Sequence, residues 1–281
     1  MFGFGRKRRE NLRTAPFPPE WAAILDRNVP CESLLDNNEK RDLRGLVQIL
    51  LHEKRFEGCA GVEITDEIRV TVAAQACLLL LNRPTDVYPR LRTILVYPDA
   101  FLAPAVEHLE DGVVVEGMEA RAGESWSLGN VVLSWADVLE GAADPGDGYN
   151  PVLHEFAHQL DDESGASEGA PSLPDRSSEV EWKRIFSREY RALSAGRSSP
   201  MDSYGAKSPA EFFAVATETF FERPVELKTA HPDVYDQLRK YYRQDPALRM
   251  LRRMLGLQDR SVVIAGMRQV SGRGIKIRRG F

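Results

Sequence analysis

An HExxH motif lies near the middle of the chain, formed by His154, Glu155 and His158 within the segment VLHEFAHQLD. On an α-helix, residues four apart share one face, so both imidazoles can bind the same Zn²⁺ ion. Glu155 lies about 100° further round the helix, beside such a metal, where a general base can take a proton from water. The motif therefore predicts a zinc site with His154 and His158 as ligands and Glu155 as the catalytic base.

A third protein ligand is needed, because a catalytic zinc normally has three protein ligands and leaves its fourth position for water. No HxxGxxH continuation follows His158, so the candidates are carboxylates of a later helix, predicted between residues 203 and 221. Glu211 and Glu218 fall on one side of that helix. Residues 208–211 also form a capping box, in which Glu211 only caps the helix. Spacing alone does not choose between Glu211 as a cap, Glu211 as a ligand and Glu218 as a ligand.

The segments VLHEFAHQLD and SYGAKSPAEFFAVATETFF resemble the Mlc titration factor A family of zinc peptidases, and the likeness runs from about residue 17 to residue 246. The second segment is also similar to the catalytic domain of anthrax lethal factor, where a Tyr-Gly pair precedes an Ala-Glu-Phe-Phe-Ala run. This resemblance implies that Glu211 is the third zinc ligand and that Tyr204 assists the transition state. Lethal factor has another glutamate four residues after the ligand; here that position is Val215, so nothing carries over.

The resemblance implies a zinc metallopeptidase of the gluzincin type, with one Zn²⁺ per chain and a peptide or protein as substrate. Its name also implies a partner, a transcriptional repressor. The rival hypothesis is a non-catalytic regulatory protein that sequesters a repressor through a zincin-shaped surface. The residues favour an enzyme, because a structural zinc site does not need Glu155 and normally closes the fourth position with a protein ligand. Endopeptidase and aminopeptidase action are both left open.

Composition places the chain among ordinary globular proteins. It has 281 residues, of which 43% are hydrophobic and 28% charged, and a net charge of −5. This mild acidity gives no reason to expect nucleic-acid binding. Cys31, Cys59 and Cys77 show no metal-type or paired spacing, which favours reduced thiols in a cytoplasmic protein. The longest apolar run, residues 73–81, is too short to span a bilayer, so no integral membrane association is expected.

Both ends of the chain are predicted to lie outside the folded part. Residues 1–9 read MFGFGRKRR, in which no apolar stretch follows the charges as in a secretory signal, so residues 1–16 are expected to be a basic flexible tail. Residues 255–281 combine glycines with a basic end and are expected to be partly extended or disordered. Residues 17–254 are then a single zinc-peptidase domain.

Hydrophobic periodicity predicts an α+β fold, mainly helical, with a small, mostly antiparallel sheet before the HExxH helix. The resemblance implies that this fold is zincin-like. Helices are expected over residues 31–54, 65–82, 179–193 and 231–243. Strands are expected over residues 93–97, 112–116 and 130–135. In HExxH peptidases an edge strand binds the substrate main chain by strand addition, and residues 130–135, nearest the motif, are the candidate edge.

Three further residues carry hypotheses of lower weight. Asp161 follows His158 by three residues and either orients an imidazole or is an exposed acid at the helix end. His231 is expected to be a cap-like or surface residue rather than a ligand. The packing of Trp135 in the core is at least as plausible as a role in the cleft. Residues 165–178, rich in Ser, Gly and Pro, are expected to form a flexible loop near the cleft.

Overall fold

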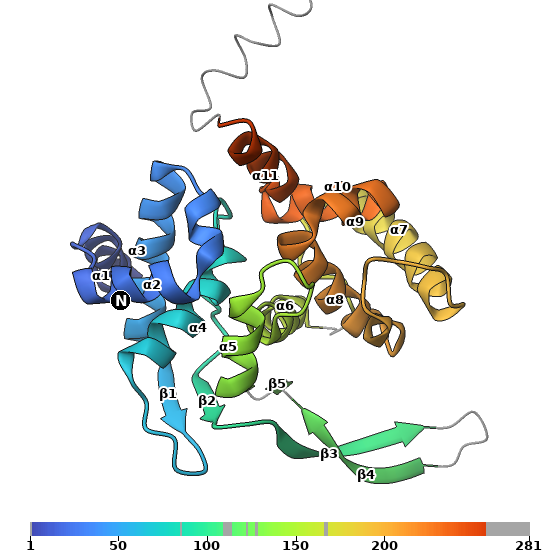
Figure 1. The fold of residues 1–281 in the computed structure, drawn as a ribbon, viewed down its shortest axis with the longest axis horizontal. Coiled ribbons are helices and arrows are strands. Elements are labelled where there is room, and N and C mark those ends of the chain that lie inside the picture. The colour runs from blue at the N-terminus through green and yellow to red at the C-terminus, as the bar shows by residue number, and fades with distance from the viewer. Residues whose placement is uncertain are drawn as a thin grey trace, which may run out of the picture.

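A computed structural model describes residues 2–84, 86–108, 114–121, 123–126, 129–165 and 168–256; for residues 2–5 and 101–126 it describes the backbone only. Figure 1 shows an N-terminal group of helices beside a C-terminal group, with the strands along one edge of both. The helices of the N-terminal group are α1 (Phe2–Thr14), α2 (Pro19–Asn28), η1 (Pro30–Leu34), α3 (Asn37–Glu53) and α4 (Asp66–Leu78). The strands are β1 (Arg55–Gly58), β2 (Thr93–Tyr97), β3 (Phe101–His108), β4 (Val114–Arg121), β5 (Gly123–Trp126) and β6 (Asn130–Ser134).

Later in the chain, helices follow one another with short connections. They are α5 (Trp135–Ala143), α6 (Pro151–Asp162), α7 (Arg176–Ser194), η2 (Ser203–Ala206), α8 (Pro209–Glu222), α9 (Pro224–Ala230), α10 (Pro232–Tyr242) and α11 (Pro246–Met254). In the described part of the chain no helix is long and apolar enough to cross a membrane. The expected C-terminal tail lies outside the described residues from position 257 onward.

The N-terminal segment differs from the flexible tail expected of residues 1–16. It forms α1, which packs against α3. Arg9 makes a two-pronged ion pair with Glu53 at the end of α3, with nitrogen–oxygen distances of 2.6 and 2.8 Å. The basic residues that suggested a solvated tail therefore include one that ties the helix to its neighbour. Arg13 adds a second ion pair, to Asp42 of α3.

The helix expected over residues 31–54 is divided in two. A short 3₁₀ helix, η1, ends at Leu34, and α3 begins after Asp36. The Asp36 carboxylate accepts hydrogen bonds from the N–H groups of Asn38 and Glu39, and the Glu39 carboxylate accepts one from the N–H of Asp36. This reciprocal capping box fixes the helix start at residue 37. Thr65 caps the next helix, since its hydroxyl accepts from Ile68 N.

The sheet was expected to be mostly antiparallel, and this prediction is wrong. Its strand order is β1-β2-β6-β5, and β1 pairs with β2, and β2 with β6, in parallel. Only β5 joins antiparallel, against β6, while β3 and β4 form a separate antiparallel pair. Parallel neighbours require a crossover connection, and the first is supplied by α4 between β1 and β2. The prediction missed β1 because its residues, Arg-Phe-Glu-Gly, lack the β-branched run of a typical strand.

The predicted edge strand is also wrong. The strand β6 covers Asn130–Ser134 and lies between β2 and β5, with Val131, Val132 and Leu133 buried. Trp135 is not part of it: this residue begins α5, which Ser134 caps through Asp137 N, and its side chain packs against the core. Consecutive apolar residues indicate burial on both faces, which an interior strand provides. The edge nearest the HExxH helix is β5, which contacts α6.

A single cluster of buried apolar side chains joins the two groups of helices. At the contact between α4 and α6, the ring of Tyr88 packs edge-on against Phe156, with centroids 4.8 Å apart, and its hydroxyl donates to Ala76 O. The inward face of α7 carries Trp182, Ile185 and Phe186, which are all buried. This packing fixes the position of α6 from both sides.

The loop after α6 is anchored by Asp161, which is buried. Its carboxylate accepts from Gly169 N at 2.7 Å and from Ala170 N at 2.8 Å. Trp182 Nε1 donates to Gly169 O at 3.0 Å. Asp161 was expected either to orient an imidazole or to be an exposed acid. Its carboxylate instead anchors the loop after α6.

Gly169 allows a prediction about this loop. Its φ is +71°, and a Cβ there would lie 2.1 Å from the carbonyl oxygen of Pro209. Gly196 has a similar φ of +78° but no atom within 4 Å of its would-be Cβ, so it is a matched control. Gly196→Ala should cost about 1 kcal/mol of unfolding free energy through backbone strain alone, and Gly169→Ala about 2 kcal/mol more. Denaturant unfolding of both variants tests this, and equal losses would contradict it.

Candidate metal centre

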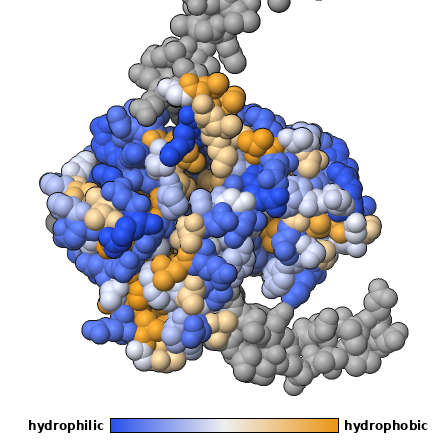
Figure 2. Space-filling model, in the orientation of Figure 1, coloured by the Kyte–Doolittle hydropathy of each residue, from blue (hydrophilic) through white to orange (hydrophobic). Residues whose placement is uncertain are grey.

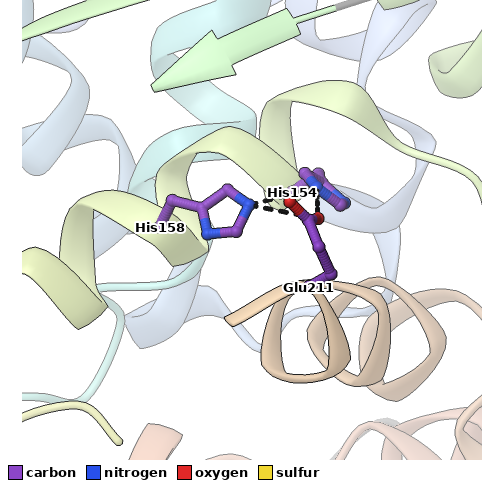
Figure 3. Close-up of side chains that lie close together, drawn as sticks. All are labelled: His154, His158 and Glu211. Carbon is purple, nitrogen blue, oxygen red and sulfur yellow. Dashed lines mark hydrogen bonds and ion pairs between the residues drawn. The ribbon is translucent and has the colours of Figure 1, made fainter. Parts of the chain in front are cut away.

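The HExxH motif is carried by α6, whose start is fixed by Asn150. The side-chain oxygen of Asn150 accepts from Leu153 N at 3.0 Å, and Pro151 occupies the first turn, where its missing N–H costs no hydrogen bond. Phe156 and Leu160 are completely buried. With the apolar side of the helix fixed in the core, His154 and His158 face α8 (Figure 3).

The residue that meets the two histidines is Glu211, at the start of α8. Its carboxylate Oε2 lies 2.9 Å from His154 Nε2 and 3.4 Å from His158 Nε2, and the two Nε2 atoms are 3.2 Å apart. Ser208 caps α8 by accepting from Glu211 N at 3.2 Å. The Glu211 main chain is therefore part of a cap while its side chain points to the histidines.

The donor set fits a metal ion. His154 Nδ1 lies 2.7 Å from the Glu218 carboxylate, and a carboxylate accepts, so Nδ1 carries a proton. In the neutral ring Nε2 then offers a lone pair, and it faces a second carboxylate, that of Glu211. Two acceptors at 2.9 Å require a proton or a cation between them. Tetrahedral zinc with bonds of about 2.0–2.1 Å places its ligand atoms roughly 3.3 Å apart, close to the three observed separations.

The pKa values reflect the same need for positive charge. Burial lowers the pKa of His154, but the charge of Glu218 and the hydrogen bonds to Glu211 and Glu218 outweigh it, so the pKa is raised well above the usual value. Burial likewise opposes ionisation of Glu211, yet its contacts with His154 and His158 lower its pKa. Three residues, His154, His158 and Glu211, are thus arranged to hold a cation.

Glu218 has a different place from Glu211. Its Oε1 contacts Nδ1 of His154, on the ring edge opposite the cluster, and its Oε2 accepts from Asn150 N at 2.7 Å. Glu222, one turn later, accepts from the Asn150 side chain at 3.0 Å. The three residues form a buried polar chain that orients His154 and joins the start of α6 to α8. The sequence predicted that Glu218 lies on the same side of the helix as Glu211, but it gave Asn150 no role. The position of Asn150 before a helical proline was the available signal.

The predicted base, Glu155, and the predicted transition-state residue, Tyr204, both lie near the two histidines. Glu155 is buried, and burial raises its pKa to about 7. Tyr204 lies in η2, where Asp202 accepts from Tyr204 N, and its ring centroid is 5.9 Å from that of His154. The Lys207 ammonium lies 4.2 Å from the Tyr204 ring centroid. A base that titrates near neutrality and a phenol near the rings are both available at the site.

His231 is not part of the cluster, and it is not the surface residue expected. It is buried between α7 and the segment before η2, where Nδ1 lies 2.8 Å from Glu189 Oε2 and Nε2 lies 2.9 Å from Ser199 Oγ. Arg188 also donates to Glu189. His231 therefore has a structural role, at the start of α10.

Glu222 gives a pH-dependent prediction. Burial, followed by the nearby charge of Glu218, raises its pKa from 4.5 to about 9. Because the folded-state pKa is the higher one, the carboxyl group is tolerated at low pH and destabilises the fold increasingly as pH rises toward 9. Glutamine has no proton to lose. The unfolding free energy of Glu222→Gln relative to the natural chain should therefore increase from about pH 5 to about pH 8, by at least about 1.4 kcal/mol, the equivalent of one pKa unit.

Denaturant unfolding at the two pH values measures this difference. Glu181→Gln, at an exposed position of α7, is the matched control and should change little relative to the natural chain over the same interval. A Glu222→Gln difference that is independent of pH would show that Glu222 is ionised in the folded state.

The chain is similar to known proteins over most of its length. A protein of Synechocystis sp. described as uncharacterised is 42% identical over 246 residues, which cover 86% of this chain and 90% of that protein. Mlc titration factor A of Yersinia pestis and of Yersinia pseudotuberculosis are each 30% identical over 258 residues, covering 89% of this chain and 94% of theirs. The model of the family described as glucose-regulated metallo-peptidase M90 matches residues 4–243. That match spans the HExxH helix and Glu211 alike, and the chain belongs to the M90 family of glucose-regulated metallo-peptidases.

Proposed function

We propose that this protein is a zinc-dependent peptidase of the gluzincin type, with His154, His158 and Glu211 as the ligands of one Zn²⁺ per chain. The observation that carries the proposal is the convergence of three donor atoms, His154 Nε2, His158 Nε2 and Glu211 Oε2, from two helices. Glu218 contacts the far nitrogen of His154, which supports a positioning role for it rather than ligation.

Zinc held by two histidines and one carboxylate supplies a Lewis acid and lowers the pKa of water. Glu155 takes the proton from the attacking water and passes it to the leaving amine. Burial favours this role, because a carboxyl group whose pKa is near 7 can both accept and release a proton at neutral pH. Tyr204 donates a hydrogen bond to the oxyanion that develops on the peptide carbonyl.

The substrate main chain is proposed to add to β5. This strand is the edge of the sheet on the side of α6, and its outer backbone groups can pair with an extended peptide. The role expected of residues 130–135 thus passes to residues 123–126, because β6 is already paired on both sides. A strand-like peptide bound there would lie alongside the helix that carries His154 and Glu155.

The second candidate function is binding of a transcriptional repressor. It is favoured by one observation, the name Mlc titration factor A of relatives that share 30% identity over most of both chains. Sequestration does not need a general base, whereas peptide hydrolysis does, so the two functions are separable at Glu155. A cytoplasmic location, favoured by the three unpaired thiols, suits either function.

The first test replaces the proposed base. Glu155→Gln should retain zinc, because Glu155 is not among the three clustered donors, and should lose hydrolysis of peptides by at least about a hundredfold. Peptide-library cleavage together with elemental analysis measures both quantities. If Glu155→Gln hydrolysed peptides as fast as the natural chain, and a chelator still abolished that activity, the role of Glu155 would be contradicted. Repressor binding that survives in the inactive variant would show that the second function is independent of the first.

The second test separates ligand from positioning residue. The natural chain should carry about one zinc, Glu211→Ala should lose nearly all zinc affinity, and Glu218→Ala should bind zinc only about 10–100-fold more weakly. If Glu211 were only a cap, its alanine variant would instead lose about 0.5–2 kcal/mol of stability and keep its zinc. Zinc titrations against a competing chelator, with unfolding measured in parallel, distinguish these outcomes.

A further inference from the structure

A large concave surface lies away from the metal centre, between the start of α3 and the helices α10 and α11. Its volume is about 940 Å³, within the range of ligand-binding clefts. None of His154, Glu155, His158, Tyr204 or Glu211 lines it. We call it the α3–α11 groove.

The groove is strongly basic in a chain of net charge −5. Seven cationic side chains line it: Lys40, Arg239, Lys240, Arg243, Arg249, Arg252 and Arg253. Three acidic side chains line it: Asp36, Glu39 and Asp245. A concave surface lined by one sign of charge focuses its electrostatic field and attracts partners of the opposite sign. The partner is therefore anionic.

The acidic residues of the groove already have partners in the fold. Asp36 caps α3, Asp245 caps α11, and Glu39 pairs with Arg249 at 2.6 Å. Several cations have no such partner: within the described part of the chain, no carboxylate forms an ion pair with Lys40, Arg243, Arg252 or Arg253. The Nε of Arg252 is buried, and no described residue accepts a hydrogen bond from it. The excess positive charge is thus available to a ligand.

Apolar side chains adjoin this charge. Leu34, Leu35 and Leu248 line the groove, and on α11 and just after it Leu251 and Leu255 are 50% and 62% exposed. Leu248, Leu251 and Leu255 follow one another at the spacing of a single helix face, next to Arg252. Figure 2 shows hydrophobic surface gathered at the end of the molecule from which α11 projects, next to strongly hydrophilic surface.

We propose that the α3–α11 groove binds an acidic, amphipathic helical segment of another protein. Acidic side chains would pair with the unpaired cations, and the apolar face would cover the leucines of α11. A nucleic acid would use the positive charge but leave the leucines without a partner, so the combination favours a peptide. The remaining C-terminal residues 257–281 contain six basic side chains and one acidic side chain, a charge that does not complement the groove.

The probe is a fluorescent synthetic peptide of about 14 residues, with leucines at i, i+3, i+4 and i+7 and glutamates elsewhere. Its binding to the full-length zinc-loaded protein is measured by fluorescence anisotropy at about 50 and 200 mM salt, with the probe checked for cleavage by mass spectrometry. The comparison probes are the same peptide with lysines in place of glutamates, and oligo-deoxythymidine. The acidic peptide should bind, the lysine peptide should not, and binding should weaken with salt.

Charge reversal tests the location. The double variant Lys40→Glu, Arg243→Glu changes two lining cations that form no ion pair with a carboxylate of the described residues. It should weaken binding of the acidic peptide at least about tenfold. The matched control Arg184→Glu, Arg191→Glu makes the same change in net charge at exposed positions of α7 and should leave the dissociation constant within about twofold. Thermal unfolding confirms that both variants are folded.

The leucines test the class of partner. The variant Leu251→Ser, Leu255→Ser should weaken binding of the acidic peptide and leave binding of oligo-deoxythymidine unchanged. Equal weakening by the α7 control would assign the binding to net charge and overturn the site. Tighter binding of the oligonucleotide than of the peptide, lost in Lys40→Glu, Arg243→Glu, would make the groove a nucleic-acid site and overturn the partner. Peptidase activity, measured in parallel, should be unaffected, so this result is independent of the metal centre.

Discussion

The arrangement of the molecule depends on how the ring of His154 is held between two carboxylates of one helix. Glu218 contacts Nδ1 and Glu211 contacts Nε2, so two carboxylates of α8 bind the two ring nitrogens of His154 on α6. An imidazole between two carboxylates in a buried place must carry, or share, a positive charge. Removing the imidazole would leave both buried carboxylates without their positive partner. The same contacts therefore hold α6 against α8 and create the affinity for a cation.

Backbone and side-chain amide groups stabilise these buried acids by donating hydrogen bonds to them. Asn150 contributes its main-chain N–H to Glu218 and its side-chain amide to Glu222, while its carbonyl oxygen caps α6. Burial, followed by the nearby charge of Glu218, raises the pKa of Glu222 to about 9, which favours its protonated form at neutral pH. One residue thus satisfies two acids and a helix terminus, while burial of Phe156 and Leu160 fixes the rotation of α6 about its axis. That rotation is what directs both histidines at Glu211.

The parts of the site that lie within one helix were predictable from sequence, and the parts that depend on long-range packing were not. The HExxH spacing places His154 and His158 on one face whatever the rest of the chain does. The choice between Glu211 and Glu218 as the residue near both Nε2 atoms depends on how α8 is rotated against α6, and seven residues are close to two helical turns, so both acids remain on that face. Only the resemblance favoured Glu211, and its function as a ligand stays a prediction.

The prediction of an antiparallel sheet was wrong for a similar reason. The direction of a strand follows from its connections, and β1, with its charged and glycine residues, gave no signal that a crossover existed. The first helix was missed because its basic residues were interpreted without their partner, Glu53, which is 44 positions away.

The anchoring of the loop after α6 has a consequence for how this chain can vary in length. Asp161, one turn beyond His158, holds the N–H groups of Gly169 and Ala170, and Gly169 in turn lies against the carbonyl of Pro209, two residues before Glu211. The chain between His158 and Glu211 is thus held at two points before α7 begins, by the bonds of Asp161 and by the contact of Gly169 with Pro209. Insertions and deletions between residues 162 and 169 would pull on a buried carboxylate, whereas those between Ala170 and the start of α7 would pass into solvent without disturbing the distance between the two helices. A change in chain length after Ala170 would therefore leave the distance between the HExxH helix and Glu211 intact.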